Sequence, residues 1–451
     1  MSWKANTSTQ TPHTPSPVDL FTHIHVDLNS FFASVEQEMH PEYRNKPLAV
    51  VPTFADTTCA IAASYEAKAL GIKTGTRVSE IKRLCPDIII VQGNHEDYAR
   101  FSRRIADAVD GVCPVAHTPS IDEMVCQLLG REQQPHHARQ IALDIKQAIK
   151  DHVGSTLRCS IGMAPNRYLA KIASDMQKPD GLIGLLPSQL PRAIAHLELR
   201  DLPGVGARTE AMLNHKKITT MPQLLALDRN GMHALWNSVW GDRLYHWLRG
   251  HDTGDDGAPM PSEMQKSLGH SHVLAPVHRS PTGSWAVAHK LMHKAAMRLR
   301  MEKMHAASLS LTVRYALTRE QAATLPKTKK HLSGITHVAW GMEARFPHCQ
   351  DTLSLLEALQ GMWGQSPAGP LYEKPFFVGL AMGRLIPEDE QQPTLFTDPD
   401  NRNLLSSTMD KLNLKYGHTT LHFAGMLPAR DSAPTRIAFT QVPVQYGTEW
   451  M

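Results

Sequence analysis

Apolar and polar residues alternate near the start of the chain, and the alternation predicts a strand over residues 21–28. Ile24, Val26 and Leu28 would point to one side of this strand, and the residues between them to the other. Asp27 is the last residue of the polar side. A carboxylate is therefore expected at the end of a strand whose other face is buried.

The next stretch predicts helices mixed with short strands. A helix, NSFFASVEQEM, should follow the first strand directly, capped by Asn29 or Ser30. LAVV (48–51) and CAIAA (59–63) have the pattern of short buried strands. SYEAKALGI predicts a helix that ends at Gly71.

A second strand and helix are expected around residue 160. LRCSIGM (157–163) predicts a strand, and NRYLAKIASDM (166–176) predicts a helix with one apolar stripe. Arg167, Lys171 and Lys178 fall on another face of this helix and its extension. Because strands and helices mix through the first 180 residues, they favour an α+β domain.

The pattern changes twice beyond this domain. Residues 187–255 predict only helices, arranged around LPGVG (202–206), and residues 251–264 have the Gly, Pro and acidic content of a linker. A second α+β module is expected next. Its predicted elements are a basic helix (285–304), an alternating strand SLSLTVRY (308–315), a helix (351–363) and a strand ending at residue 386. From about residue 387 the composition turns to acids, Pro and Gln, and a short structured segment (402–425) precedes a loose end.

Length and composition indicate a globular protein of several domains. The chain has 451 residues, of which 42% are apolar and 20% charged, so three or four domains are expected. No apolar run reaches the length of a membrane span. The six cysteines form no CxxC pair, which argues against a zinc site or a disulfide framework and favours a reducing cytoplasm. The net charge of +4 permits a polyanionic partner.

Three carboxylates are the strongest candidates for chemistry. Besides Asp27, the segment PSIDE places Asp122 next to Glu123 among small and apolar residues. Such carboxylates are costly unless cations neutralise them, and three that converge can hold the two divalent metals of nucleotidyl transfer. Neighbours in a strand point to opposite faces, so both can reach metals only at a strand end or a bend. Taken singly, Asp27 could be a helix cap and the pair a solvated surface pair. The 25 histidines lack HExxH-like spacing and are not expected to bind metal.

Five segments, in this order, resemble the successive motifs of Y-family DNA polymerases of the DinB and UmuC type, which copy damaged templates. They are HVDLNSFFASVEQ, AASYEAKALGIKTG, PSIDE, SIGMAPNRYLAKIASDMQKPDG and DLPGVG. The resemblance runs from about residue 21 to residue 386. It implies an α+β multidomain fold, shaped as a right-hand polymerase. The implied function is template-directed, low-fidelity DNA synthesis across lesions, without proofreading.

The resemblance also implies the domain organisation. The expected parts are a flexible leader (1–20), a catalytic palm (21–38 and 97–185), fingers (39–96), a thumb with a helix-hairpin-helix (186–255), a linker (256–264), an α+β little finger (265–386) and a tail with a clamp-binding motif (387–451).

The metal centre is assigned by the same resemblance. Asp27, Asp122 and Glu123, together with the backbone carbonyl of Leu28, are expected to bind two Mg²⁺ ions. One ion would activate the primer 3′-hydroxyl, and the other would hold the triphosphate. After SIDE the chain continues MVCQ (124–127), where the family commonly has an Ala-Tyr-Leu-Asp-like run. This departure leaves the ligands unaffected.

Four residues match positions that contact the incoming dNTP in the family. Phe32 matches the steric gate, a ring that leaves no room for a ribose 2′-hydroxyl, whereas Phe31 better fits a core position. Tyr65, Lys68 and Lys171 match positions that grip the triphosphate. The position of Lys68 is often Arg, and Lys lacks the bidentate fork, so weaker dNTP binding is an open question.

Primer-template DNA is the implied macromolecular substrate. Gly204 and Gly206 would let backbone N–H groups of LPGVG approach a DNA phosphate, although an ordinary helix–helix turn is the alternative. In the little finger, Arg314 on the polar strand face and the basic helix would contact the duplex backbone. The alternative is that these charges are only solvated.

QQPTLF (391–396) resembles the sliding-clamp peptide of bacterial polymerases. Leu395 and Phe396 would fill an apolar pocket of the clamp, and Gln392 would bond to backbone at its rim. About 55 residues follow, and LSSTMDKLNLKYGHTTLHFAG among them faintly resembles the C-terminal extension of UmuC-type proteins, so their role stays open. A cytoplasmic monomer without a membrane partner is expected.

Two other functions stay open from the sequence. A non-catalytic DNA-binding scaffold of the same fold could recruit other polymerases through the tail, but it would not need the three carboxylates. A cyclase or another palm-fold nucleotidyltransferase could use similar carboxylates. It would not explain LPGVG, the basic module or QQPTLF.

Overall fold

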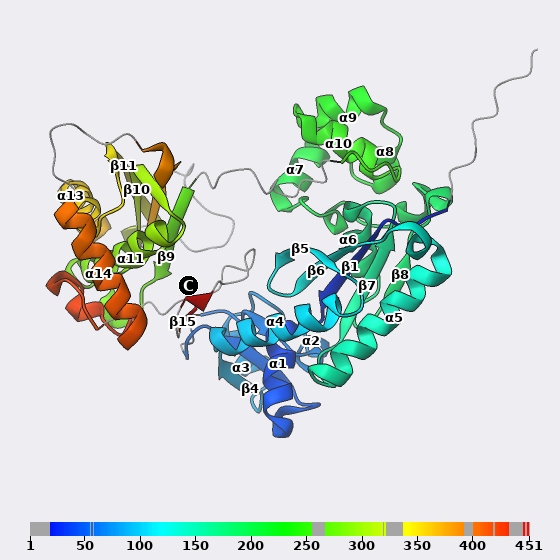
Figure 1. Ribbon diagram of the computed structural model, residues 1–451, viewed down its shortest axis with the longest axis horizontal. Helices are drawn as coiled ribbons and strands as arrows, with labels where there is room; N and C mark the ends of the chain where they lie inside the picture. The colour runs from blue at the N-terminus through cyan, green and yellow to red at the C-terminus, as the bar shows by residue number, and fades with distance from the viewer. Residues whose placement is uncertain are drawn as a thin grey trace, which may run out of the picture. The chain divides into compact units, whose positions relative to one another are not determined.

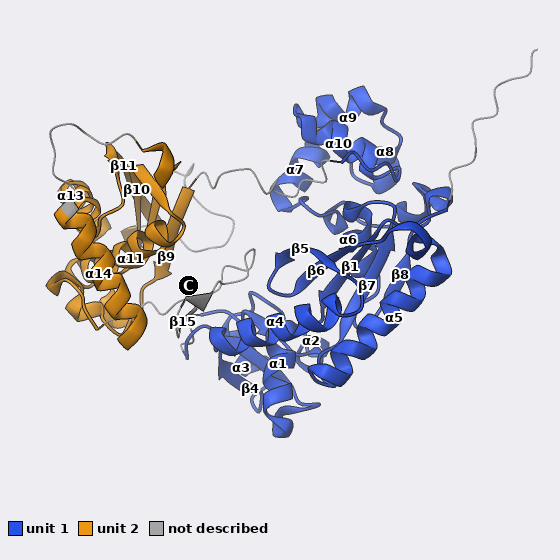
Figure 2. Cartoon of the chain, viewed as in Figure 1, with its two compact units in different colours: residues 1–258, 437–443 blue, residues 259–436, 444–451 orange. Residues whose placement is uncertain are grey.

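The computed structural model describes residues 19–54, 56, 58–254, 267–318, 320–321, 337–391, 400–417, 420–432, 445–446 and 449–450. The chain divides into two compact units, residues 1–258 with 437–443 and residues 259–436 with 444–451 (Figures 1 and 2). The predicted leader up to residue 18, the predicted linker and the clamp peptide from Gln392 onward lie outside the described residues. None of the described helices combines the length and apolar content that a membrane crossing needs.

A five-stranded sheet forms the centre of the first unit. Its strand order is β5-β6-β1-β7-β8, and its pairs are antiparallel except β7 with β8. The strands are β1 (His23–Leu28), β5 (Val115–Ser120), β6 (Glu123–Gln127), β7 (Cys159–Ala164) and β8 (Leu182–Gly184). Helix α6 (Arg167–Met176) packs against β1 and β7, and helix α5 (Pro135–His152) also contacts β7. The central strand β1 is thus buried along its whole length.

A smaller sheet with the order β3-β2-β4 is also part of the first unit. Its strands are β2 (Leu48–Val51), β3 (Ala62–Ala63) and β4 (Ile89–Gln92), and the helices around it are α1 (Phe31–Met39), α2 (Tyr65–Ala69), α3 (Val78–Leu84) and α4 (His95–Asp110). The strand predicted over 59–63 is shorter than expected, because Cys59 makes only an isolated bridge to Arg77. The predicted capping of α1 is wrong. Ser30 has a left-handed φ of 50° and makes no side-chain cap bond, while Asn29 bonds elsewhere.

Described residues 187–254 are helical, as the sequence predicts. The α-helices are α7 (Ala207–His215), α8 (Met221–Leu225), α9 (Arg229–Trp236) and α10 (Val239–Trp247). Their apolar residues share one core with α6, in which Tyr168 stacks on Trp247 with 5.2 Å between ring centroids. The Tyr168 hydroxyl also donates to the carbonyl of Pro203 at 2.9 Å. The LPGVG turn is therefore fastened to α6.

The second unit contains a five-stranded antiparallel sheet, in which β11, β10, β12 and β9 follow one another and β13 (Ile386–Pro387) pairs with β10. Its strands are β9 (Ser267–Val273), β10 (Met304–Ala316), β11 (His337–Cys349) and β12 (Pro375–Gly383), and its main helices are α11 (Pro281–Met301) and α13 (Thr352–Trp363). Leu309, Leu311 and Val313 of β10 enter the core that these helices cover. The polar residues between them, including Arg314, therefore lie on the opposite face. Strand β11 was not predicted, although apolar residues alternate along it from Val338 to Phe346 and pack against the core of this unit.

Beyond residue 385 the chain adds further described elements to the second unit. They include β13 (Ile386–Pro387), the 3₁₀ helix η9 (Glu388–Glu390), α14 (Asp400–Tyr416) and the 3₁₀ helix η10 (Ala424–Ala429). The guanidinium of Arg300 on α11 contacts both carboxylate oxygens of Asp410 at 2.7 and 2.8 Å. The backbone N–H of Thr352 donates to the Ser406 hydroxyl at 3.1 Å. The segment expected to be structured is thus a covering layer over α11 and α13.

Candidate active site

The register of the central sheet brings the three predicted carboxylates to one place. Asp27 lies directly opposite Glu123 in the β1–β6 pair. Strand β5 ends at Ser120, so Asp122 lies in the turn before β6. The backbone carbonyl of Asp122 accepts the N–H of Leu28 at 2.9 Å. The bend that adjacent ligands require is therefore present.

Two lysines pair with Asp27, one on each carboxylate oxygen. Lys171 Nζ is 2.5 Å from Asp27 Oδ2 and 2.8 Å from Glu123 Oε1, and Lys178 Nζ is 2.7 Å from Asp27 Oδ1. Both lysines also contact Asp175, at 3.2 and 2.8 Å. The sequence analysis gave no role to Lys178. The available signal was its spacing of seven residues from Lys171, about two helical turns, although α6 ends at Met176 and Lys178 lies just beyond it.

Lys171 reaches the carboxylates because α6 lies very close to β7. A Cβ added at Gly162 of β7 would lie 2.0 Å from the carbonyl oxygen of Ala170 and 2.4 Å from the nitrogen of Ser174. Any larger residue at this position would push α6 away from the sheet. Gly162 of the SIGMAPN segment thus sets the distance between Lys171 and Asp27.

The electrostatics of the centre favour an additional cation. Burial raises the pKa values of Asp122 and Glu123, although the Ser120 hydroxyl, 2.5 Å from Asp122, and the Lys171 ammonium oppose the shift. Burial disfavours the charge of Lys171, but Asp27 and Glu123 outweigh it and raise the pKa of this lysine. The lysines alone therefore do not compensate the cost of burying the acidic groups.

The donor atoms also suit a divalent metal. Single ligand atoms of His25, Asp27 and Glu123 lie within 4.8 Å of one another, and Asp122 is adjacent. Carboxylate oxygens are the ligands that Mg²⁺ and similar hard cations prefer. The residues present therefore fit a divalent-metal centre.

His25 is a member of this cluster that the sequence analysis did not single out. It lies two residues before Asp27 on the same face of β1, with Nε2 3.8 Å from Glu123 Oε2. Neither ring nitrogen has a hydrogen-bond partner among the described residues. Burial lowers the pKa of His25 well below its ordinary value, so the ring is neutral. A neutral imidazole beneath the carboxylates adds no charge to the site.

Tyr65 and Lys68 lie on α2 near the same charges. Lys68 Nζ is 4.3 Å from the centroid of the Tyr65 ring. Burial raises the pKa of Tyr65, whereas burial and the charge of Lys178 lower the pKa of Lys68. Asp27 acts on both groups electrostatically. The predicted triphosphate residues are thus gathered around Asp27, with Lys171 in direct contact.

Phe32 is buried against a second aromatic residue. Its ring stacks on Tyr98 of α4, with 4.3 Å between centroids and 13° between planes. The Tyr98 hydroxyl donates to Glu36 Oε1 at 2.5 Å. Phe31 is also buried, and its ring centroid is 5.7 Å from that of Phe32. Burial alone therefore does not distinguish the two rings, and the contact with Tyr98 is the feature specific to Phe32 here.

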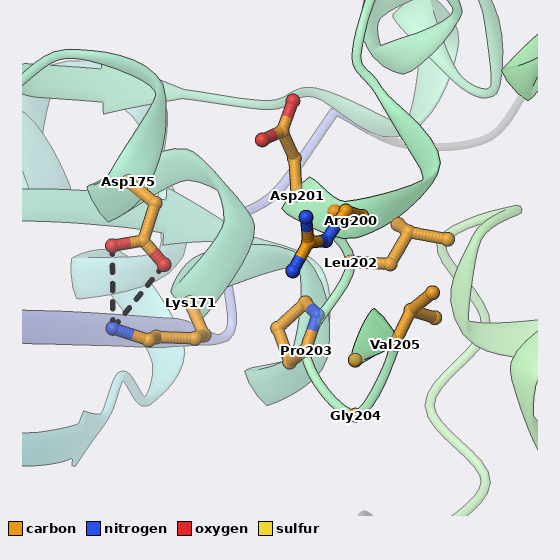
Figure 3. A pocket seen from close by; sticks show the side chains of 9 residues that line it. Lys171, Asp175, Arg200, Asp201, Leu202, Pro203, Gly204 and Val205 are labelled. Atoms are coloured by element: carbon orange, nitrogen blue, oxygen red, sulfur yellow. Dashed lines mark hydrogen bonds and ion pairs between the residues drawn. The ribbon is translucent and has the colours of Figure 1, made fainter. Parts of the chain in front are cut away.

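The LPGVG turn lines an open pocket of about 440 Å³ together with Lys171 and Asp175 (Figure 3). Gly204 has a φ of +87°, which favours glycine, and Gly206 is the residue before α7. Arg200 adds a cation to the pocket wall. The turn predicted to bind DNA therefore borders the helix that carries the catalytic-site lysine.

The two predicted DNA contacts of the second unit have different surroundings. Arg314 is exposed, and its guanidinium lies 4.6 Å from the ring centroid of Phe377 on β12. On the basic helix, Lys290 is buried and donates to the carbonyl of Arg430. The predicted contact of this helix with DNA is wrong for Lys290, and also for the Arg300 side chain that binds Asp410. The C-terminal segment covers both.

The clamp-binding residues Gln392, Leu395 and Phe396 lie outside the described residues. The residue before them is fixed on the second unit, because Gln391 Nε2 donates to the carbonyl of His348 at 3.3 Å. Helix α14 of the same unit begins at Asp400. The first residue of the peptide and the helix that follows the peptide therefore belong to the second unit.

Comparisons with known proteins agree with this fold and site. Residues 26–175 match the impB/mucB/samB family, and residues 265–395 match the C-terminal domain of that family. DNA polymerase IV of Moorella thermoacetica is 31% identical over 406 residues, which cover 88% of this chain and 94% of the relative. DNA polymerase IV 1 of Bacillus subtilis is 28% identical over 433 residues, which cover 92% of this chain and 96% of the relative.

Two solved structures share the fold. A Y-family DNA polymerase chimera of Dbh and Dpo4 has a TM-score of 0.64 and 21% identity, and the insertion ternary complex of Dbh DNA polymerase has a TM-score of 0.52 and 20% identity. Each match covers 81% of this chain and 99% of the solved one. The predicted class, an α+β right-hand polymerase, is therefore confirmed.

The chain belongs to the Y family of DNA polymerases, and its function is that of a DNA-directed DNA polymerase of the translesion type. The non-catalytic alternative is not supported. Y-family polymerases depend on divalent metals, in agreement with the acidic centre.

Proposed function

We propose that the chain extends a primer by two-metal nucleotidyl transfer from a dNTP to the primer 3′-hydroxyl. Asp27, Asp122 and Glu123, with the carbonyl of Leu28, would hold two Mg²⁺ ions, and these ions would supply the positive charge that nucleotidyl transfer needs. The observation that carries this proposal is the β1–β6 register that sets Asp27 opposite Glu123, with Asp122 in the adjoining turn.

The triphosphate is received by the cations around Asp27. The ammonium groups of Lys171 and Lys178 lie at the two carboxylate oxygens of Asp27. Tyr65 and Lys68 are close enough to feel the charges of Asp27 and Lys178. Phosphate oxygens accept strong hydrogen bonds from such groups. We add Lys178 to the predicted set because its ammonium, like that of Lys171, pairs directly with Asp27, at 2.7 Å. Lys68 offers one point charge where an Arg would offer a fork, which weakens the grip on the dNTP.

The sugar is selected by Phe32. Its ring is held flat on Tyr98 and packs under C2′ of the incoming nucleotide, so a ribose hydroxyl has no room. This contact discriminates by shape, because no polar group of the protein has to recognise the missing hydroxyl.

Primer-template DNA lies along the LPGVG turn and the polar face of the second sheet. Backbone N–H groups at Gly204 and Gly206 and the guanidinium of Arg314 contact phosphates, which positions DNA without reading its sequence. In this proposal the palm is 21–38 with 97–185. The other parts are the fingers (39–96), the thumb (186–255) and the little finger (265–386). Small fingers check base-pair shape weakly, so fidelity is low, and errors remain without proofreading.

The clamp peptide connects the polymerase to a sliding clamp. Leu395 and Phe396 enter an apolar pocket of the clamp, and Gln392 bonds at its rim. The polymerase itself acts as a monomer in the cytoplasm, where the template and dNTPs are found.

Primer extension with and without Mg²⁺ tests the catalytic proposal. An Asp122→Ala/Glu123→Ala variant should bind primer-template DNA but fail to extend it at any Mg²⁺ concentration. Asp144→Ala, on the exposed face of α5, is the control and should extend normally. Equal extension by the double variant and the wild type would reject the assignment.

A further inference from the structure

Lys178 lies on a short segment, Gln177–Gly181, that joins α6 to β8. Its ammonium is 2.7 Å from Asp27 Oδ1 and 2.8 Å from Asp175 Oδ1. The lysine is not part of a helix or a strand, so its position depends on whatever fixes this segment.

Two buried polar side chains hold both ends of the segment. Asn29 Oδ1 accepts the N–H of Asp180 at 2.8 Å, and Asn29 Nδ2 donates to the Ser160 hydroxyl at 3.1 Å. The same hydroxyl donates to the carbonyl of Gln177 at 3.0 Å and accepts the N–H of Gly181 at 3.2 Å. Asn29 and Ser160 are 3% and 0% exposed, so no solvent competes for these bonds.

The geometry of the segment leaves little freedom around these bonds. A Cβ at Gly181 would lie 2.0 Å from the carbonyl oxygen of Gln177, so only glycine fits this tight turn. Asp180 has a left-handed φ of 59°, and Lys146 Nζ contacts its carbonyl oxygen at 2.9 Å and its Oδ1 at 2.6 Å. The turn is thus fastened from Asn29 directly after β1, from Ser160 of β7 and from Lys146 of α5.

The residues that fasten the segment are also the neighbours of the metal ligand. Asn29 follows Asp27 by two positions, and Ser160 is the register partner of Asp27 in β7. Asn29 does not cap α1, so its carboxamide serves this network instead. Any shift of Asp27 therefore moves the anchors of Lys178 with it.

We propose that Asn29 and Ser160 are positioning residues for the triphosphate: they fix the ammonium of Lys178 relative to Asp27 so that it meets the incoming dNTP already ordered. This inference rests on the proposed role of Lys178 in binding triphosphate. Without the network the segment and the lysine must be ordered when the nucleotide binds, and that entropy cost weakens binding. Loss of the network should therefore raise the KM for dNTP more than it lowers kcat.

A double-mutant cycle of Asn29→Ala and Lys178→Ala tests the proposal, with steady-state single-nucleotide insertion as the readout. Lys178→Ala should raise the KM for dNTP roughly tenfold, as expected for loss of a hydrogen bond from a charged group, and Asn29→Ala roughly fivefold, as expected for loss of neutral hydrogen bonds. The double variant should be no worse than Lys178→Ala alone, because the network acts only through the lysine. Asn29→Asp retains the acceptor for the Asp180 N–H and should restore most of the wild-type KM.

Ser284→Ala is the control for loss of a buried polar group and matches Ser160→Ala directly, since it removes a buried hydroxyl that bonds to Pro281 in the second unit. It should leave the KM for dNTP unchanged, and thermal melting of every variant reports folding. If Asn29→Ala does not fold, Ser160→Ala replaces it in the cycle. The inference is overturned if the rise in KM of the double variant equals the product of the rises in the two single variants. It is also overturned if Asn29→Ala has the wild-type KM. Either result leaves the proposed function standing. An unchanged KM in Lys178→Ala overturns both the assigned role of this lysine and the inference. A wild-type chain that does not extend primers rejects the proposed function itself.

Discussion

The ring of Phe32 lies flat on the ring of Tyr98, with 4.3 Å between their centroids. Phe32 belongs to α1 and Tyr98 to α4, so two helices build the proposed sugar gate together. Tyr98 is fully buried, and its hydroxyl bonds back to Glu36 on α1. The position of the gate is therefore set by a packing contact that α1 could not provide alone.

Replacing Phe32 by Ala should raise ribonucleotide insertion by at least about tenfold, equivalent to ~1.4 kcal/mol of lost discrimination. The discrimination is measured as the ratio of kcat/KM for a dNTP to kcat/KM for the matching rNTP. Phe31→Leu is the control, and it should keep the wild-type ratio. An unaltered ratio in Phe32→Ala would move the gate to another residue.

Glu36 should make stability depend on pH in the weakly acidic range. Burial raises its pKa, although the hydrogen bond from Tyr98 opposes the shift. A carboxyl group whose folded-state pKa is raised stabilises the fold below its unfolded pKa and loses that contribution as pH rises through the folded pKa. The free energy of unfolding of the wild type should therefore fall, relative to Glu36→Gln, as pH rises from about 4 to about 7.

Urea unfolding of both proteins at several pH values measures this difference. The other titrating groups are common to the two chains and cancel to first order. A difference that stays constant with pH would show that Glu36 has its ordinary pKa in the folded chain.

Asp122→Asn should separate stability from metal binding. Burial raises the pKa of Asp122, so its charged form costs free energy when no metal is bound. The metal-free variant should melt at or above the wild-type Tm. Mg²⁺ at ten times its Kd should stabilise the wild type by about 1.4 kcal/mol and the variant by much less. Equal Mg²⁺-induced Tm shifts in the two proteins would contradict the ligand assignment.

Lys171→Ala should destabilise the metal-free chain, because it leaves Asp27 and Glu123 with less compensating charge. We expect a loss of about 1–3 kcal/mol, below the value for a fully buried pair since the Lys171 side chain is 22% exposed. Mg²⁺ should reduce this loss by supplying the missing charge. Lys150→Ala, exposed on α5, is the control for removal of a lysine. A loss that Mg²⁺ leaves unchanged would argue that Lys171 acts in packing only.

Leu395→Ala with Phe396→Ala should abolish binding to a sliding clamp and spare distributive synthesis. The two side chains supply the apolar contact of the peptide, and neither is part of the active site. Clamp pull-down and primer extension without clamp provide the two measurements. A pull-down that survives both substitutions would place the clamp contact elsewhere.

The residue pattern alone was enough to locate the strand that carries Asp27, the helix that carries Lys171 and the PSIDE carboxylates. These features depend on alternation or helical periodicity over a few residues, and such local signals are visible in one sequence. The bend at Asp122 followed from the same geometry, because two adjacent ligands require it.

Contacts between distant segments were decided by the tertiary structure. The approach of Lys178 to Asp27, the stacking of Tyr98 under Phe32 and the place of His25 beneath Glu123 each join residues on different elements. The periodicity of a segment tells which of its faces is apolar or charged, but it does not tell which other face it will meet. For this reason the basic helix α11 looked free to bind DNA, although Arg300 on it is paired with Asp410, more than a hundred residues away.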